Sequence, residues 1–201
     1  VSKQVSDSLF SWHPGSAGTI SYGTVNSLNQ YPTVGGASYA YNSSGCLTGD
    51  GVWTYTYSTE NQLLTANKTG VSLAFKYDPY GRQVEKAVGA VKTRFYYSGF
   101  QRLGDYDSTG VLQTRYVYAP GLDEVAIQVS NTGTKTYFHA DNQGSVIATT
   151  DSTGAVVNRY KYGPFGETSS LPGISHGYTG QRYDSESGLY FYKSRFYSPA
   201  L

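Results

Sequence analysis

The sequence is poor in charged residues, in cysteine and in long apolar runs, and it contains no methionine. A net charge of +1 gives no electrostatic attraction for nucleic acid, so we expect no nucleic-acid partner. No apolar stretch approaches the roughly 20 residues that a membrane helix needs. The single cysteine, Cys46, excludes an internal disulfide and a zinc site built from several cysteines. We therefore expect no membrane span and no cofactor.

The beginning of the chain differs from the rest. Because the chain starts at Val1 and has no methionine, we expect a processed product or an excised fragment, and no signal peptide is visible. Residues 1–20 show no regular pattern, and Trp12, His13 and Pro14 are expected in a loop or at an edge. Residues 21–201 are expected to form one β-ribbon.

Tyrosine and glycine are abundant, with 21 and 24 copies among 201 residues. Tyrosine favours strands and glycine marks turns, whereas a disordered chain would lack the aromatic residues. No window of 11 or more residues shows helical periodicity, and Val125, Ile127 and Val129 alternate as they would on one face of a strand. The composition and the pattern predict an all-β fold.

The stretch "FKYDPYGRQVEK" is the clearest local unit. Phe75 and Tyr77 would share one face of a strand, and Asp78 to Gly81 fits a type I turn closed by a glycine that accepts positive φ. Related turn signals recur in steps of 9 to 12 residues through the second half, which is the spacing of an antiparallel hairpin array. The residues assigned to turns and repeats are Tyr77, Asp78, Gly81, Asp107, Gly110, Asp141, Gly144, Asp151, Gly154, Gly163, Gly166, Tyr183, Asp184 and Gly188.

Candidate catalytic groups are few. His13, His139 and His176 lack ligand spacing, and no Gly-x-Ser-x-Gly nucleophile elbow is present. The sequence does not exclude Asp123/Glu124 or Asp184/Glu186 as the carboxylate pair of a glycosidase, although Asp184 is better explained as a turn residue. We therefore predict a protein that is not an enzyme, with no catalytic, metal or cofactor-binding residue.

Arginines are interleaved with tyrosines along the chain. This pattern is open to two interpretations: a stacking platform for single-stranded nucleic acid, or cation–π and hydrogen-bond contacts between strands. The near-zero net charge favours the structural interpretation. Carbohydrate binding by exposed tyrosines is equally open. The arginines concerned are Arg82, Arg94, Arg102, Arg115, Arg159, Arg182 and Arg195.

Several motifs together resemble the RHS or YD-repeat family. "YDPYGRQ" is similar to its Tyr-Asp-x-x-Gly-x-Leu unit, and "NSLNQYPTVGG" to its Asn-x-Leu-Asn-Gln-Tyr segment. "YFHADNQGSVIATTDSTGAVVNRYKYGPFGE" and "GYTGQRYDSESGLYFYKSRFYSP" resemble the RHS repeat-associated core. The resemblance covers roughly residues 20 to 201. It implies a twisted ribbon of antiparallel hairpins, part of a spiral β-shell.

The resemblance also implies a role. Shells of this family enclose a C-terminal toxin and act in bacterial competition or in insecticidal toxin complexes, which implies a secreted or cell-surface protein. The expected function is a non-enzymatic shell segment, with the rest of a shell, copies of itself or a C-terminal effector as partners. The chain departs from the family at Asn142, where a histidine is common, and it stops at Leu201, before the region linked to self-cleavage.

A second function remains open: a self-assembling or adhesive extracellular ribbon. A hairpin array leaves a sheet edge whose backbone N–H and C=O groups can pair with another chain. In "YFYKSRFYS" the only charges are Lys193 and Arg195, so we assign Phe191 and Phe196 to an assembly edge.

Overall fold

The structure, a computed structural model, is described for residues 19–200. Contacts divide these residues into two units, residues 19–92 and residues 93–200, called here the N-terminal and the C-terminal unit. The expectations for Trp12, His13 and Pro14 lie outside the described residues. The proposed division into an irregular segment and a ribbon stays a prediction.

The expected all-β fold is confirmed, because antiparallel strands make up both units. The N-terminal unit begins with a small hairpin of β1 (Thr33–Val34) and β2 (Ala37–Ser38). A meander follows, in which each strand pairs with the next: β3 (Ala40–Tyr41), β4 (Leu47–Gly49), β5 (Thr54–Tyr57), β6 (Leu63–Lys68), β7 (Val71–Tyr77) and β8 (Gln83–Val88).

One face of β7 is buried, and its residues alternate with the period of 2 that a strand requires. In β7 the residues Leu73 and Phe75 are buried, and their neighbours Ser72, Ala74 and Lys76 are exposed. Ala66 on β6 pairs with Leu73, and Tyr55 on β5 pairs with Ala66, so both lie on this buried face. The other buried apolar residues of the unit are Trp53, Leu63 and Ala87, and Ala87 pairs with Ala74 on the opposite face.

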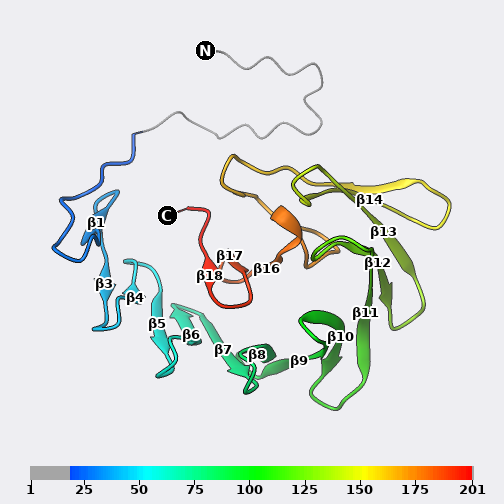
Figure 1. Ribbon diagram of the computed structural model, residues 1–201, viewed down its shortest axis with the longest axis horizontal. Helices are drawn as coiled ribbons and strands as arrows, with labels where there is room; N and C mark the ends of the chain where they lie inside the picture. The colour runs from blue at the N-terminus through cyan, green and yellow to red at the C-terminus, as the bar shows by residue number, and fades with distance from the viewer. Residues whose placement is uncertain (1–18, 201) are drawn as a thin grey trace. The chain divides into compact units, whose positions relative to one another are not determined.

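The C-terminal unit contains a second meander in sequence order (Figure 1). Its strands are β9 (Val91–Ser98, starting just before the unit boundary), β10 (Gln101–Asp107), β11 (Leu112–Tyr118), β12 (Val125–Ser130), β13 (Lys135–Ala140), β14 (Val146–Thr150) and β15 (Val156–Arg159). No helix among residues 19–200 is long and apolar enough to cross a membrane.

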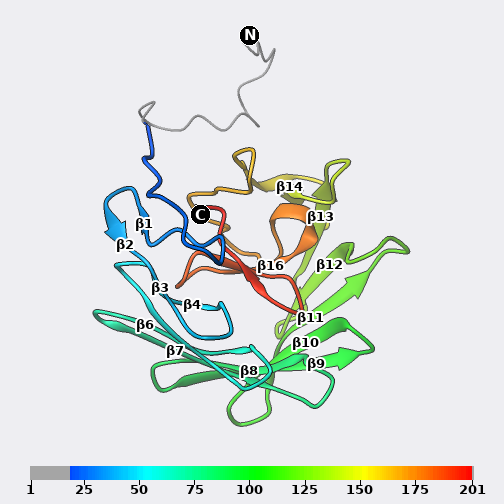
Figure 2. The same ribbon diagram turned by 60° about the vertical axis from the view of Figure 1, so that its left-hand side comes forward.

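After β15 the chain returns across the C-terminal unit. It forms the short 3-10 turn η2 (Tyr178–Gly180) and a three-stranded sheet of β16 (Arg182–Asp184), β17 (Leu189–Phe191) and β18 (Phe196–Tyr197). Figures 1 and 2 both show β16 on the side toward which the β9–β14 meander curves. Residues 160–200 are called the return segment below.

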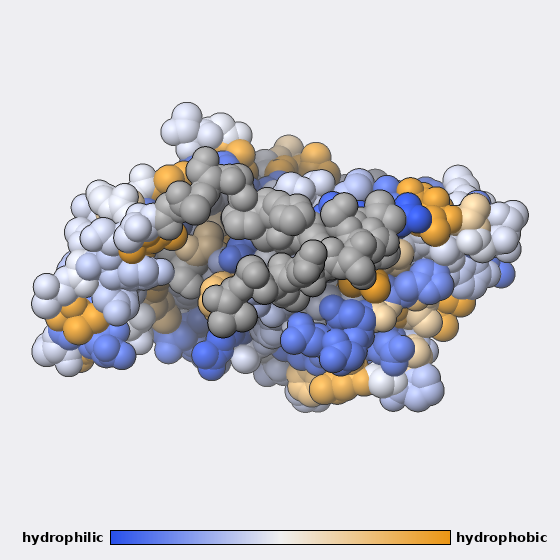
Figure 3. Space-filling model, turned by 90° about the horizontal axis from the view of Figure 1, so that it is seen from above, coloured by the Kyte–Doolittle hydropathy of each residue, from blue (hydrophilic) through white to orange (hydrophobic). Residues whose placement is uncertain are grey.

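The return segment is anchored by apolar and aromatic packing. Val146, Tyr160 and Leu171 form a buried cluster against which Phe138 and Ile174 pack. Tyr190 on β17 is fully buried, and its hydroxyl donates to the Gly166 carbonyl at 3.0 Å. On the face drawn in Figure 3, the apolar residues shown in orange form small separate groups among hydrophilic ones.

Turns of one design connect many of the strands. In the Asp78 turn, Gly81 has φ +78° and its N–H donates to the Asp78 carbonyl at 2.9 Å. Oδ1 of Asp78 accepts hydrogen bonds from the backbone N–H groups of Tyr80 and Arg82, both at 3.0 Å. A register shift between Lys76 and Tyr77 accompanies the turn. This is a type I turn with a bulge at the following glycine.

The tyrosine before a turn makes a second repeated contact. In five places a tyrosine directly precedes the first residue of a turn, and its hydroxyl donates to a backbone carbonyl 10 to 16 residues earlier in the chain. In four of them the acceptor is the first or second residue of a preceding strand. The pairs are Tyr41–Tyr31 (3.0 Å), Tyr57–Leu47 (2.8 Å), Tyr77–Leu63 (2.8 Å), Tyr118–Arg102 (3.1 Å) and Tyr162–Val146 (2.9 Å).

At Tyr77-Asp78 these contacts give both residues of the Tyr-Asp pair a role. The aspartate closes its own turn, and the tyrosine connects that turn to an earlier part of the ribbon. Burial raises the pKa of Tyr57 and of Tyr118 to about 12, so both hydroxyls keep the proton that they donate at neutral pH. In these five places a turn is therefore connected to an earlier part of the chain by a side chain as well as by backbone.

Candidate functional site

The most unusual chemistry of the described residues lies in the C-terminal unit, where two arginines are buried among aromatic rings. The Arg102 guanidinium lies over the rings of Phe95 and Tyr116, with Cζ 4.7 and 4.8 Å from their centroids. The Arg182 guanidinium lies over Phe95 and Phe191, at 4.6 and 4.8 Å. Phe95 is thus shared by both cations. These five residues are called the arginine–aromatic ladder.

The ladder joins the meander to the return segment. Phe95, Arg102 and Tyr116 come from β9, β10 and β11, and Arg182 and Phe191 come from β16 and β17. Buried cation–π contacts contribute about 1–2 kcal/mol each, and they let a charged group occupy an interior position. The local sequence produces this because strand alternation directs Phe95, Arg102 and Tyr116 to the same buried face.

Hydrogen bonds fix Arg102 further. Its Nη2 donates to Oδ2 of Asp105 at 2.7 Å, to the Tyr116 hydroxyl at 2.7 Å and to Oγ of Ser175 at 3.0 Å. The Tyr116 hydroxyl in turn donates to Oδ2 of Asp105 at 2.9 Å. Burial alone would lower the pKa of Arg102, but the Asp105 carboxylate and then Tyr116 raise it above its ordinary value. Arg102 is therefore charged although it is only 5% exposed.

The pKa values of His176 and Arg182 are lowered, in contrast to that of Arg102. Burial, followed by the charges of Arg102 and Arg182, lowers the pKa of His176 well below its ordinary value, so the imidazole is neutral at pH 7. Its ring lies edge-on to Tyr116, with centroids 4.8 Å apart. Burial and the charge of Arg102 also lower the pKa of Arg182. The arginine–aromatic ladder thus holds two guanidinium groups that repel one another.

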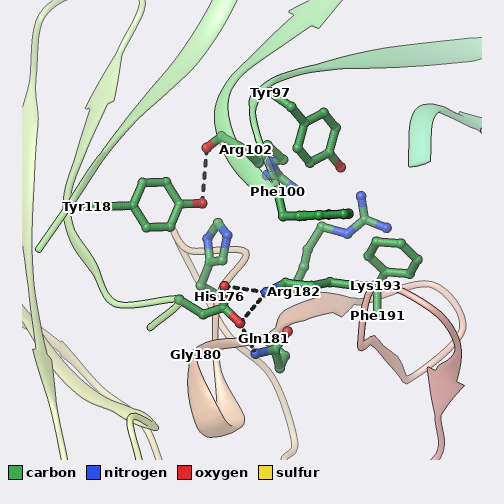
Figure 4. A pocket seen from close by; sticks show the side chains of 11 residues that line it. Tyr97, Phe100, Arg102, Tyr118, His176, Gly180, Gln181, Arg182, Phe191 and Lys193 are labelled. Carbon is green, nitrogen blue, oxygen red and sulfur yellow. Dashed lines mark hydrogen bonds and ion pairs between the residues drawn. The ribbon is translucent and has the colours of Figure 1, made fainter. Parts of the chain in front are cut away.

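A third cation lies at the rim, as Figure 4 shows. Nζ of Lys193 donates to both carboxylate oxygens of Asp123, at 2.6 and 2.7 Å, and Nε2 of Gln181 donates to Oδ2 of Asp123 at 3.1 Å. Gly180 packs so closely on the Asp123 loop that a Cβ there would lie 2.9 Å from the Asp123 carbonyl oxygen. These contacts hold the loop after β11 against the return segment.

Two adjoining spaces open beside these residues. A cavity of about 50 Å³ is lined by Arg102, His176, Arg182 and the rim residues, and Figure 4 shows their side chains around it. A wider hollow of about 530 Å³ is lined by Phe100, Gln101, Pro120, Gly121 and Leu122. Both spaces share Phe100, Asp123 and Lys193 as lining residues.

The sequence-derived candidates are distributed as follows. Of the carboxylates, Asp123 is bound by Lys193, and Asp184 is 1% exposed and accepts a hydrogen bond from the Ser187 backbone N–H at 3.2 Å. His139 contacts the Thr150 hydroxyl at 3.0 Å and does not belong to the arginine–aromatic ladder. His13 lies outside the described residues. Within residues 19–200 there is no group of three His, Cys, Asp or Glu residues that could hold a metal ion.

The turn residues adopt the geometry that their positions require. Gly110, Gly144, Gly154, Gly166 and Gly188 all have positive φ. Asp107, Asp141 and Asp151 each accept backbone N–H groups two and four residues ahead, at 2.8–3.1 Å. The Gly163 carbonyl accepts the Gly166 N–H at 3.1 Å, and the Asp184 carbonyl accepts the Gly188 N–H at 2.8 Å. The Tyr183 ring packs at a tilt against that of Tyr190, with ring centroids 4.8 Å apart.

The two residues assigned to an assembly edge, Phe191 and Phe196, do not both lie on an edge strand. Phe191 is buried on β17, the middle strand of its sheet, where it serves the ladder. Phe196 lies on the outer strand β18, half-buried, with its ring 5.2 Å from that of Phe191. Only Phe196 is therefore on an edge strand, and its part in assembly stays a prediction.

Two features were not predicted from the sequence. The interleaved arginines were expected to act as one group, whereas Arg102 and Arg182 are buried and Arg94, Arg115 and Arg159 are exposed. The carbonyl acceptors of the tyrosine hydroxyls were also not predicted, although a tyrosine directly before a turn residue was a visible signal for these contacts. Arg102 and Asp105, three residues apart, were a local signal for the buried ion pair.

Comparison with known proteins gives consistent matches. The family model described as Teneurin YD-shell matches residues 9–201. The tRNA nuclease WapA of Bacillus subtilis is 31% identical over 196 residues, covering 92% of this chain and 8% of the relative. The probable deoxyribonuclease RhsB of Dickeya dadantii is 31% identical over 162 residues, covering 74% of this chain and 11% of the relative.

Solved structures show the same fold. A Photorhabdus luminescens Tc holotoxin pore superposes with a TM-score of 0.58 and 19% sequence identity over 82% of this chain. The superposed part is 9% of that holotoxin chain. The chain therefore spans about a tenth of the length of the proteins that it matches.

Proposed function

Because the chain belongs to the teneurin YD-shell family, we propose that it is a structural segment of a β-shell that surrounds the C-terminal effector of a longer toxin protein. The family match over residues 9–201 is the observation that carries this proposal. Relatives named as nucleases are about ten times longer, and we propose that the named activities belong to other parts of those proteins. We further propose that the shell is secreted or displayed at the cell surface.

The repeated turn and tyrosine contacts support a wall-forming role. Each hairpin is stabilised by the next strand and several also by a tyrosine hydroxyl, so a ribbon of such units grows by adding neighbours. The arginine–aromatic ladder fixes the return segment on one face of the β9–β15 meander. A wall needs this kind of rigidity, because a flexible sheet would not hold a barrier around an enclosed domain.

We propose that the segment itself is not an enzyme. The candidate carboxylates Asp123 and Asp184 accept hydrogen bonds that hold loops and turns in place. The Asp105 carboxylate is bound to Arg102 and Tyr116. Incubating the purified protein for days and following its mass tests this, together with ester, peptide, glycoside and tRNA substrates. A discrete cleavage product, or turnover abolished by Asp184→Asn, would contradict the proposal.

A second candidate function is edge-to-edge association with another chain. It is favoured by β15, which is the last strand of its meander and carries Val156 and Val157 at 47% and 54% exposure. Apolar residues on an outer strand invite pairing with a further strand. In a shell this neighbour would be another part of the wall, and in an isolated ribbon it would be a second copy.

Electron microscopy and protease protection distinguish these functions. In the full-length gene product that contains this segment, we expect the segment in the wall of a hollow particle and a C-terminal domain that resists trypsin. For the isolated chain we expect assembly that increases with concentration. A full-length product whose C-terminal domain is cleaved as fast as when it is free would overturn the shell proposal.

A further inference from the structure

We propose that the C-terminal unit binds an organic carboxylate, with its charged end in the cavity beside Arg102 and its apolar end in the adjoining hollow beside Phe100 and Leu122. The proposal names a chemical class that fits three separate features: the charge of the cavity lining, the unpaired donors of Arg102, and the apolar hollow next to it.

The lining of the cavity carries excess positive charge. Arg102, Arg182 and Lys193 contribute three cations, and Asp123 is the single carboxylate among the lining residues. His176 adds no charge at neutral pH, because burial lowers its pKa. Outside the lining, Asp105 is bound to Nη2 of Arg102, and the buried Asp184 partly offsets the lowering of the pKa of Arg182 by burial and by Arg102, so these carboxylates balance part of the positive charge. A bound anion would relieve the remaining repulsion between the buried guanidinium groups.

Two nitrogens of the Arg102 guanidinium have no hydrogen-bond acceptor among the described residues. Its Nη2 makes three hydrogen bonds, whereas its Nε and Nη1 are buried with no hydrogen-bond partner among the described residues. A buried donor without a partner costs about 1–3 kcal/mol. The rings of Phe95 and Tyr116 lie against the guanidinium, 4.7 and 4.8 Å from Cζ, and an acceptor reaches the free N–H groups in the plane of the guanidinium, at its edge. A carboxylate oxygen is the acceptor that arginine binds most strongly at this edge.

The hollow beside the cavity suits the apolar part of such a molecule. Its volume of about 530 Å³ is within the usual range of small-molecule sites, about 300–1,000 Å³. Phe100 and Leu122 line it and are 61% and 92% exposed, so their apolar surfaces gain most from a bound apolar group. Because the hollow and the cavity share Lys193, one elongated molecule can reach both.

Three matched probes test the proposal by NMR titration of the ¹⁵N-labelled protein. Phenylacetate carries both the ring and the carboxylate, 2-phenylethanol carries the ring without the charge, and acetate carries the charge without the ring. We expect phenylacetate to bind at least about tenfold more tightly than either of the other two, as expected for one charged hydrogen bond or one buried ring. The Nε–Hε resonance of Arg102 should shift with phenylacetate.

Two variants and a control locate the site. Leu122→Ser changes an exposed side chain and should leave folding intact, yet weaken phenylacetate binding several-fold. Arg102→Gln should abolish the preference for phenylacetate over 2-phenylethanol, and its thermal unfolding reports whether the unit still folds. Arg115→Gln alters an exposed arginine on the neighbouring strand and should bind normally. Equal affinity for phenylacetate and 2-phenylethanol, or binding unaffected by Leu122→Ser, would overturn the proposal.

Discussion

Lys193 binds both carboxylate oxygens of Asp123 at 2.6 and 2.7 Å, although 70 residues separate the two in the sequence. Both residues have left-handed backbone conformations, with φ of +61° and +56°. Such conformations cost about 1 kcal/mol or more in a residue other than glycine and persist only where contacts hold them. The ion pair therefore holds the loop between β11 and β12 against the loop between β17 and β18.

We predict that Lys193→Gln loosens the return segment. The Lys193 side chain is 40% exposed, so water screens the pair and the expected loss of stability is about 1 kcal/mol or less. Hydrogen exchange at β17 and β18 should accelerate more than exchange at β12. Lys135→Gln, which changes an exposed lysine on β13, is the matched control. Equal exchange rates in both variants would show that the pair contributes nothing to docking.

We predict that the tyrosine hydroxyls stabilise the ribbon. Tyr77→Phe removes the hydrogen bond to the Leu63 carbonyl at 2.8 Å and keeps the ring, so the free energy of unfolding should fall by about 1 kcal/mol. Tyr80 lies in the adjoining turn and is 78% exposed, so Tyr80→Phe should change stability by only a few tenths of a kcal/mol. Urea denaturation midpoints measure both, and equal midpoints would contradict the proposed tie between repeats.

The local features of the fold could be predicted from sequence, and the long-range ones could not. The Asp78 turn follows from four adjacent residues, because the side-chain oxygen and the glycine act within the turn itself. The contact of Phe95 with Arg182 depends on how a segment almost 90 residues later docks on the sheet. The alternation of residues along β9 and β16 does not specify that Phe95 and Arg182 contact each other.

The position of Phe191 in its sheet could not be predicted from the sequence for the same reason. Its sequence context, "YFYKSRFYS", is aromatic and low in charge, which is equally typical of an exposed edge and of a strand buried on both sides. The return of the chain across the meander decides between them, since it places β17 in the middle of its sheet. Periodicity could not resolve this, because a strand of three buried residues has no alternation to read.

We predict that Gly81→Val destabilises the N-terminal unit by about 1–2 kcal/mol, because valine is strained at φ +78°. Space is not the cause, since a Cβ at this position would meet only Nε2 of Gln62, at 3.4 Å. The control is Ala74→Val, which introduces the same side chain at an exposed position of β7. Equal denaturant midpoints for the two variants would contradict the backbone explanation of the repeated glycine.

We predict that stability falls as the pH drops below about 6.5, because of His176. Its pKa lies well below the ordinary 6.5 in the folded protein, since burial and the charges of Arg102 and Arg182 disfavour the protonated ring. The unfolded chain then binds a proton that the folded chain does not, so the free energy of unfolding decreases by up to about 1.4 kcal/mol per pH unit. Urea midpoints at about pH 7.5 and about pH 5 measure the loss, in a range above the carboxylate titrations. His176→Gln should reduce the difference between the two pH values, while the exposed His139→Gln should retain it. An unchanged difference in His176→Gln would assign the pH dependence to other groups and would show that the buried ring is not the one protonated on unfolding.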